Sequence, residues 1–146
     1  MSNTGIAIFN SKTYKPTLIT SVETNDKEEH GNRLHTQREY MKELIKKYPP
    51  CEVAIERSFT RFNQATQVLY RCHGIANELF HQYPQFYYAP ATIKKTITGN
   101  GQAKKEIVQK SILKKYPDLH FANDDESDAT AIILTHLIKK HKMKWN

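Results

Sequence analysis

Three acidic residues in this sequence have the types and positions that metal-dependent phosphodiester chemistry requires. Glu56 ends the short apolar run 53–55, and Asp125 and Asp128 lie three residues apart at the start of a helix. Because residues three apart face the same side of a helix, the two aspartates can share one cation. Neighbouring carboxylates raise each other's pKa unless a hard divalent ion such as Mg²⁺ or Mn²⁺ binds between them. The three carboxylates are therefore candidate metal ligands.

Two such ions about 4 Å apart would stabilise the attacking and leaving oxygens of an in-line phosphodiester displacement, without a covalent enzyme intermediate. Simpler interpretations also exist. Glu56 in isolation is typical of a solvated strand end, and acidic residues in a first helical turn complement the helix dipole. Asp128 fits the dipole interpretation less well, because it adjoins the apolar run 129–134 and an acid entering a buried helix needs a partner.

The composition favours a polyanionic partner. The 146 residues include 22 Lys and Arg against 15 Asp and Glu, a formal net charge of +7. Such an excess is typical of nucleic-acid-binding proteins, although a lysine-rich surface can also serve solubility alone. No apolar run approaches the roughly 20 residues of a membrane span. Cys51 and Cys72 have no metal-binding spacing and no secretory signal precedes them, so free thiols in a reducing cytoplasm are expected.

Hydrophobic periodicity predicts the elements that must position these residues. Two β-rich runs, 5–9 and 17–22, are typical of a hairpin, and a strand at 52–56 carries Glu56 at its end. Helical spacing with proline and glycine stops predicts four longer helices and a shorter one, with a β-prone run among them. In chain order these segments are helix 26–48, helix 63–83, the β-prone run 86–89, a short helix from 90 to 95, helix 102–116 and helix 129–140.

The order of these segments indicates an α/β fold, with a mixed β-sheet and helices on both of its faces. A chain of 146 residues suits one compact domain with one core, so we expect a single domain over residues 1–146. In such folds the ends of strands are where active sites collect. Glu56 is therefore well placed for chemistry.

Four sequence blocks resemble the RuvC Holliday junction resolvases. They are Ala54-Ile-Glu-Arg-Ser-Phe59, Thr98-Gly-Asn-Gly-Gln-Ala-Lys-Lys105, Asp125-Glu-Ser-Asp-Ala-Thr-Ala-Ile-Ile-Leu-Thr-His136 and Asn3-Thr-Gly-Ile-Ala-Ile8. The last block matches the family's second strand, and order and spacing agree along nearly the whole chain. The resemblance implies an RNase H-like fold, a homodimer formed through helix 63–83, and symmetric nicking of four-way DNA junctions with two Mg²⁺ or Mn²⁺ ions per active site.

The resemblance also assigns a metal-binding role to individual side chains. Glu56, Asp125 and Asp128 correspond to three of the family's four metal ligands. The family's fourth acid lies on a strand upstream of Thr4, so we expect the first strand of the resolvase domain to be truncated here. On that hypothesis the chain as given cleaves junctions weakly or not at all, and an upstream extension that restores an Asp-bearing strand recovers cleavage.

Basic and aromatic residues complete the set that the resemblance implies. Lys94 and Lys105 match basic positions beside the family's active site, where they neutralise phosphate charge. Lys95 and Lys104 are adjacent to them, so the assignment can shift by one residue. The loop after Glu56 offers cations for the phosphate backbone and aromatic rings for base stacking. These DNA-binding candidates are Arg57, Phe59, Arg61 and Phe62.

Two other functions stay open at the level of sequence. A non-catalytic DNA-junction binder would keep the basic residues and the dimer helix without a complete set of acids. A related RNase H-like nuclease acting on flaps, forks or other branched DNA would use the same acids, because these define hydrolysis rather than the shape of the substrate.

Overall fold

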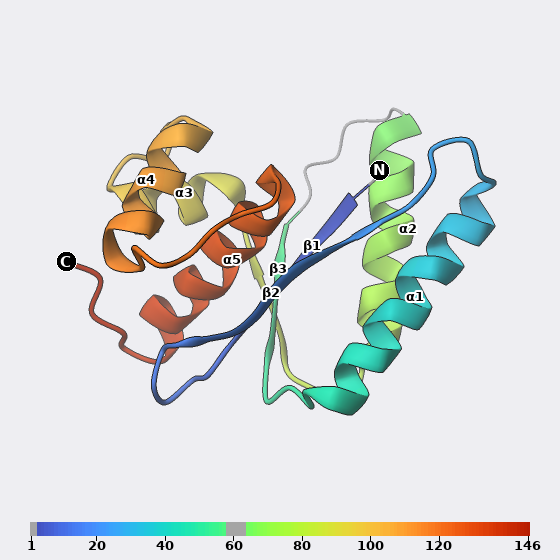
Figure 1. Ribbon diagram of the computed structural model, residues 1–146, viewed down its shortest axis with the longest axis horizontal. Helices are drawn as coiled ribbons and strands as arrows, with labels where there is room; N and C mark the ends of the chain where they lie inside the picture. Colours follow the sequence, from blue (N-terminus) through green and yellow to red (C-terminus); the bar gives the residue numbers. More distant parts are fainter. Residues whose placement is uncertain (1–2, 58–63) are drawn as a thin grey trace. The chain divides into compact units, whose positions relative to one another are not determined.

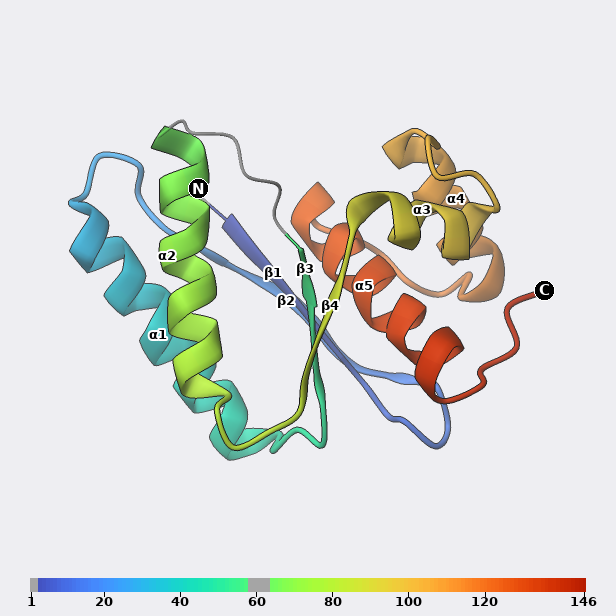
Figure 2. The same ribbon diagram turned by 180° about the vertical axis from the view of Figure 1, so that it is seen from behind.

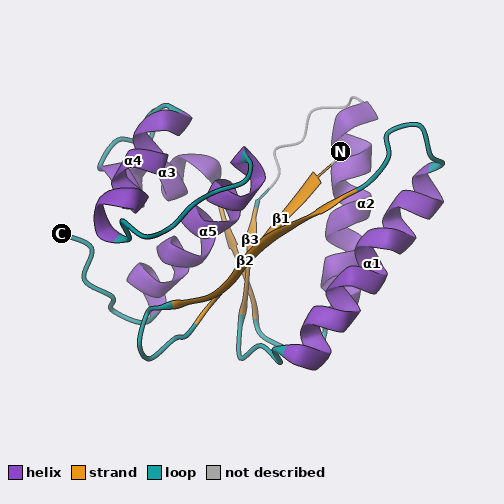
Figure 3. Cartoon of the chain, viewed as in Figure 1, coloured by secondary structure: helices purple, strands orange, loops and turns teal. Residues whose placement is uncertain are grey.

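The computed structural model describes residues 3–57 and 64–146, and within them it contains four strands and five helices (Figure 1). Strand β1 pairs with β2, and β3 pairs with β4 (Figure 3). The predicted α/β class is confirmed. In chain order the elements are β1 (Asn3–Phe9), β2 (Pro16–Glu23), α1 (His30–Lys47), β3 (Val53–Glu56), α2 (Gln64–Leu79), β4 (Gln85–Tyr88), α3 (Pro90–Thr98), α4 (Lys105–Lys115) and α5 (Asp124–Lys140).

These elements belong to two compact units. Unit 1 contains residues 3–4 and 22–87 apart from 58–63, and unit 2 contains residues 5–21 and 88–146. Unit 1 therefore holds α1, α2, β3 and most of β4, whereas unit 2 holds α3, α4, α5 and most of the β1–β2 hairpin. No helix in the described ranges combines the length and the hydrophobicity that crossing a membrane requires.

In unit 1, helices α1 and α2 lie side by side (Figures 1 and 2). The side chain of Gln37 connects them to β1. Its Nε2 donates to Thr4 Oγ1 at 2.9 Å, and its Oε1 accepts a hydrogen bond from Cys72 Sγ at 3.2 Å. Burial raises the pKa of the Cys72 thiol, which keeps it protonated as the donor. Both ends of the buried Gln37 amide are thus paired, as burial of a polar group requires.

Helix α1 begins at His30, four residues after the predicted start at Asp26. Asn25 forms a turn before it, in which its Oδ1 accepts the Lys27 amide at 3.0 Å and its carbonyl accepts the Glu28 amide at 3.0 Å. Asparagine favours such turns because its short side chain bonds the backbone that follows. The predicted start was too early because helical periodicity does not show that the Asn25 turn takes up main-chain amides that a longer helix would use.

The core of unit 2 is organised around α5, which packs against α3 and α4. Leu134 and Leu137 of α5 and Ile112 of α4 are almost inaccessible to solvent. The buried hydroxyls of Thr130 and Thr135 each donate to the carbonyl four residues earlier, at 2.8 and 2.7 Å. Helix α5 therefore buries polar residues without leaving these two hydroxyls unpaired.

Helix α5 begins at Asp124, five residues before the predicted start at Ala129. Asn123 caps it, because its Oδ1 accepts the amide of Glu126 at 3.0 Å while its Nδ2 donates to a serine hydroxyl of β2 at 2.8 Å. The buried Glu126 carboxylate in turn accepts a main-chain amide just before the helix at 2.8 Å. An Asn cap followed three residues later by Glu is a strong helix start. The acidic stretch is therefore the first helical turn.

The remaining predicted helices occur with shifted ends. Helix α2 ends at Leu79 rather than at residue 83, and α4 begins at Lys105 rather than at 102. Before α4, Asn100 Oδ1 accepts the amide of Gln102 at 2.9 Å and holds a turn. Helix α3 continues to Thr98 and stops at Gly99, whose φ of 84° favours glycine.

Candidate active site

The first turns of α5 carry the two aspartates that the sequence singles out. Asp125 and Asp128 are both half-buried, whereas Asp124 is exposed. Glu126 points its carboxylate back to the helix start, where it accepts the amide described above. Of these four acids, Glu126 therefore serves the fold, and Asp125 and Asp128 are the half-buried pair on one helical side.

Main-chain contact with β1 positions this turn. A Cβ atom placed on Gly5 would overlap the main-chain carbonyl of Asp125 and would lie 3.1 Å from the nitrogen of Glu126. Only a residue without a side chain lets β1 and α5 approach this closely. The absence of a side chain at Gly5 therefore lets the main chain of Asp125 lie directly against β1.

A lysine contacts the aspartates from the neighbouring helix. Nζ of Lys105, the first residue of α4, lies 3.2 Å from Oδ2 of Asp128 and 3.8 Å from Oδ2 of Asp124. Partial burial acts to lower the pKa of Lys105, but the hydrogen bond to Asp128 and the charges of Asp128, Asp124 and Asp125 outweigh it and raise that pKa. Lys105 is therefore charged at neutral pH.

Asp128 has a raised pKa. Burial is the largest cause; Lys105 opposes it through its hydrogen bond and charge, and the charges of Asp125 and Asp124 raise it further. One ammonium thus compensates only part of the negative charge that the three aspartates carry. A divalent cation with oxygen ligands would supply the rest, so the donor set fits Mg²⁺ or Mn²⁺.

Gln109 completes the contacts between α4 and α5 at this end. Its Nε2 donates to Oδ1 of Asp124 at 3.2 Å and to Oγ of Ser127 at 2.9 Å. The sequence predictions named neither Gln109 nor Asp124. The sequence held one signal for these contacts, namely two equal spacings. Lys105 and Gln109 are four apart on α4, as are Asp124 and Asp128 on α5.

The third predicted carboxylate lies in unit 1. Glu56 is the last residue of β3 and is exposed, and Arg57 directly after it is exposed too. The structure therefore brings together Asp125, Asp128 and Lys105 within unit 2. The other loop candidates, Phe59, Arg61 and Phe62, lie outside the described residues.

The four predicted lysines lie on α3 and at the start of α4. Lys94 is half-buried and Lys95 is exposed on α3, while Lys104 occupies the N-cap position of α4 and is exposed. Of the adjacent pair Lys104 and Lys105, the second contacts the aspartates.

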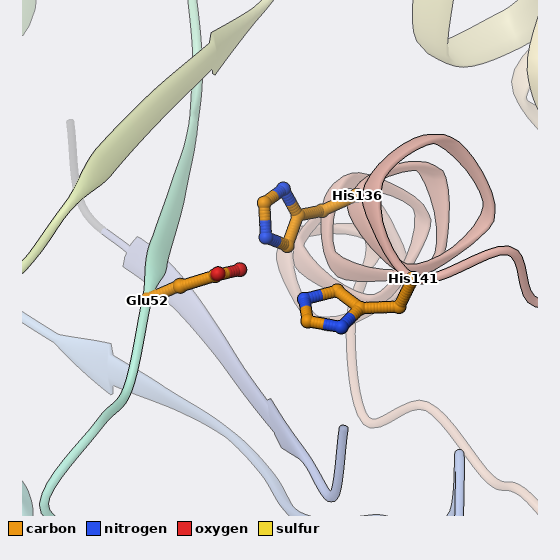
Figure 4. Close-up of side chains that lie close together, drawn as sticks. All are labelled: Glu52, His136 and His141. Atoms are coloured by element: carbon orange, nitrogen blue, oxygen red, sulfur yellow. The ribbon is translucent and has the colours of Figure 1, made fainter. Parts of the chain in front are cut away.

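Two histidines lie together at the other end of α5. His136 is buried, and its Nδ1 lies 2.7 Å from the hydroxyl oxygen of Tyr88 at the end of β4. Its ring centroid lies 5.5 Å from that of His141, which follows the helix (Figure 4). Figure 4 also shows Glu52, which directly precedes β3 in unit 1. The contact between His136 and Tyr88 joins α5 to β4 within unit 2, and the ring contact joins α5 to the residue that follows it.

A family model decides the relationship of this chain to known proteins. The model described as crossover junction endodeoxyribonuclease RuvC matches residues 1–136. The chain belongs to the RuvC family. A RuvC from Rickettsia typhi is 33% identical over 96% of this chain and 93% of its own length. A RuvC from Brachyspira hyodysenteriae is 31% identical over 90% of this chain and 85% of its own length.

Solved RuvC structures share the fold. The Thermus thermophilus RuvC structure has a TM-score of 0.80 and 22% identity, covering 96% of this chain and 89% of that one. T. thermophilus RuvC in complex with a Holliday junction substrate has a TM-score of 0.83 and 18% identity, covering 97% and 89%. The predicted RNase H-like fold is therefore confirmed. RuvC-family proteins are metal-dependent nucleases, which agrees with the oxygen donors on α5.

Proposed function

We propose that this chain is a structure-selective endonuclease that binds four-way DNA junctions as a homodimer and nicks them by Mg²⁺- or Mn²⁺-dependent phosphodiester hydrolysis in the cytoplasm. Membership of the RuvC family supports the reaction class, and the similar T. thermophilus RuvC has been solved in complex with a Holliday junction substrate. The observation that carries the proposal is the half-buried aspartate pair on α5 with Lys105 at 3.2 Å from Asp128.

Within this proposal each group has a distinct role, and residues 1–146 act as one resolvase domain. Glu56, Asp125 and Asp128 provide oxygen ligands for two ions. When bound, the ions neutralise phosphate charge and lower the pKa of a water molecule. Lys94 and Lys105 face the charge of the scissile phosphate. Further DNA contacts are proposed for Arg57, Phe59, Arg61, Phe62, Lys95 and Lys104.

The proposal is tested by incubating the full chain with an end-labelled four-way junction, a matched flap and a matched linear duplex. We expect nicks, even at a low rate, to occur in pairs in opposite junction strands, to need Mg²⁺ or Mn²⁺, and to stop when EDTA removes the ion. Faster nicking of the flap than of the junction would favour the alternative of a related nuclease that acts on other branched DNA. Junction binding in a gel without nicking at any ion concentration would instead identify a non-catalytic junction binder.

Helix α2 offers a surface for the proposed homodimer. Among its described side chains, residues 67–79, none is buried, although many are apolar. Tyr70 is 43% exposed, and a Cβ atom placed on the exposed Gly74 would meet no described atom of another element within 4 Å. A second copy laid along this side would cover both residues. Twofold symmetry would then give one nuclease site for each of two opposite strands.

The variant Tyr70→Glu is expected to weaken the dimer by at least about tenfold, because a charge buried at an interface without a partner is unfavourable. Sedimentation velocity over a range of micromolar concentrations measures the change. The matched control is Ile107→Glu, since Ile107 is 47% exposed but lies on α4 in unit 2. Unchanged dimerisation of Tyr70→Glu would place the interface elsewhere.

A further inference from the structure

Lys105 is shared by two carboxylates that differ in their proposed roles. Asp128 is a proposed metal ligand, and Asp124 is not. Their Oδ2 atoms lie 3.2 and 3.8 Å from the same ammonium nitrogen, and the two aspartates are four apart on α5. The lysine side chain is 45% exposed, so its end is partly open to solvent. A small movement of the ammonium is therefore enough to exchange one partner for the other.

The second partner is held in place by Gln109. The amide of Gln109 binds Oδ1 of Asp124 at 3.2 Å, while Oδ2 of the same carboxylate faces Lys105. The amide is itself anchored, because it also donates to Oγ of Ser127, and that hydroxyl donates to the carbonyl of Asp124 at 2.9 Å. One oxygen of the Asp124 carboxylate thus accepts a hydrogen bond from Gln109, and the other forms an ion pair with Lys105, both residues lying on α4.

We propose that Asp124 is a positioning residue that, oriented by Gln109, takes over the Lys105 ammonium from Asp128 when a divalent cation binds there. This inference rests on the proposed function, because it takes Asp128 to be a metal ligand. An ammonium and a metal ion compete for the same carboxylate, since each repels the other at short range. Without Asp124, binding of the ion would have to release Lys105 to solvent; with Asp124, the lysine remains beside the site for phosphate charge.

The same residue also has a simpler role. An acid in the first turn of a helix stabilises that helix through its dipole. That role predicts a loss of stability when Asp124 is replaced, but it predicts no dependence of metal binding on Lys105. A measurement that couples Asp124, Lys105 and the ion therefore separates the two roles.

The test is a double-mutant cycle on Mn²⁺ affinity, measured by electron paramagnetic resonance titration of the full chain without DNA. Lys105→Met is expected to strengthen Mn²⁺ binding about two- to fivefold, because it removes the competing cation. Asp124→Asn is expected to weaken it by a similar factor in the natural background and to have little effect in the Lys105→Met background. Gln109→Leu is expected to reproduce part of the Asp124→Asn effect, and Asp124→Glu to restore most of the affinity.

Matched controls and contrary outcomes define the test further. Asp118→Asn removes the same charge from an exposed position after α4 and should leave Mn²⁺ affinity unchanged. Equal weakening by Asp124→Asn in both backgrounds would overturn the inference, since Asp124 would then act only as a nearby charge. Mn²⁺ binding that is unaffected by Lys105→Met would overturn it as well, with the proposed function intact. Mn²⁺ binding that does not depend on Asp128 would overturn both.

Discussion

Replacement of Asp128 by asparagine is expected to reduce Mg²⁺-dependent nicking of four-way junctions by about 100-fold or more. The amide keeps the shape of the side chain but removes the negative charge that, in the proposed function, makes Asp128 a ligand for a hard cation, and such an ion contributes several kcal/mol to phosphodiester cleavage. In the same variant Lys105 loses the negatively charged partner that lies 3.2 Å from its Nζ. The measurement is the single-turnover nicking rate on a labelled junction, with junction affinity measured in parallel.

Asp118→Asn is the control for this prediction, because it removes the same charge from an exposed position outside the site. Its nicking rate should match that of the unaltered chain. If Asp128→Asn nicked junctions within about threefold of the unaltered chain, under conditions where chemistry limits the rate, Asp128 would not be a metal ligand.

Gly5→Ala is expected to impair both stability and nicking, although it adds only one methyl group. The added Cβ would overlap the main-chain carbonyl of Asp125, and a main-chain atom cannot move aside as a flexible side chain can. Overpacking of this kind costs about 1–3 kcal/mol of unfolding free energy. The contact can be relieved only by displacing β1 or the first turn of α5, so nicking should fall more than the loss of folded protein explains.

Gly31→Ala provides the matched control in α1. A Cβ at Gly31 would meet no described atom of another element within 4 Å, and alanine favours helices more than glycine does, so this variant should gain up to about 1 kcal/mol of stability. Urea unfolding and nicking rates of the two variants give the comparison. A Gly5→Ala chain as stable and as active as the Gly31→Ala chain would show that β1 and α5 do not meet through Gly5.

Local patterns in the sequence predicted the element order and the common side of α5 on which Asp125 and Asp128 lie. Helical spacing depends only on residues close together in the sequence, so it can be recognised without knowledge of the tertiary structure. Apolar periodicity placed the start of α5 too late, at Ala129, although the spacing of Asp125 and Asp128 already favoured a helix start within the acidic stretch. The bonds of Asn123 and Glu126 show how this first turn is capped.

The contacts between α4 and α5 could not be predicted from local sequence patterns. The spacing of Lys105 and Gln109 repeats that of Asp124 and Asp128, but many such spacings occur in a lysine-rich helical chain. Which of them meet depends on how the two helices pack. For the same reason, the sequence alone could not show why position 5 is glycine. The main chain of Asp125, which Gly5 approaches closely, lies 120 residues further along the chain.

Unit 2 combines two segments that are far apart in the chain, residues 5–21 and 88–146, so it cannot form until both have been synthesised. Hydrogen bonds between partners 102 and 127 residues apart close this unit, from Tyr116 Oη to the Tyr14 carbonyl and from Tyr14 Oη to the His141 carbonyl, both at 2.7 Å. The hairpin leaves the ribosome long before α5 does, so the unit can form only after the C-terminal helices have emerged. A nascent chain therefore presents the hairpin without the aspartate turn, and the two come together only after α5 has been synthesised.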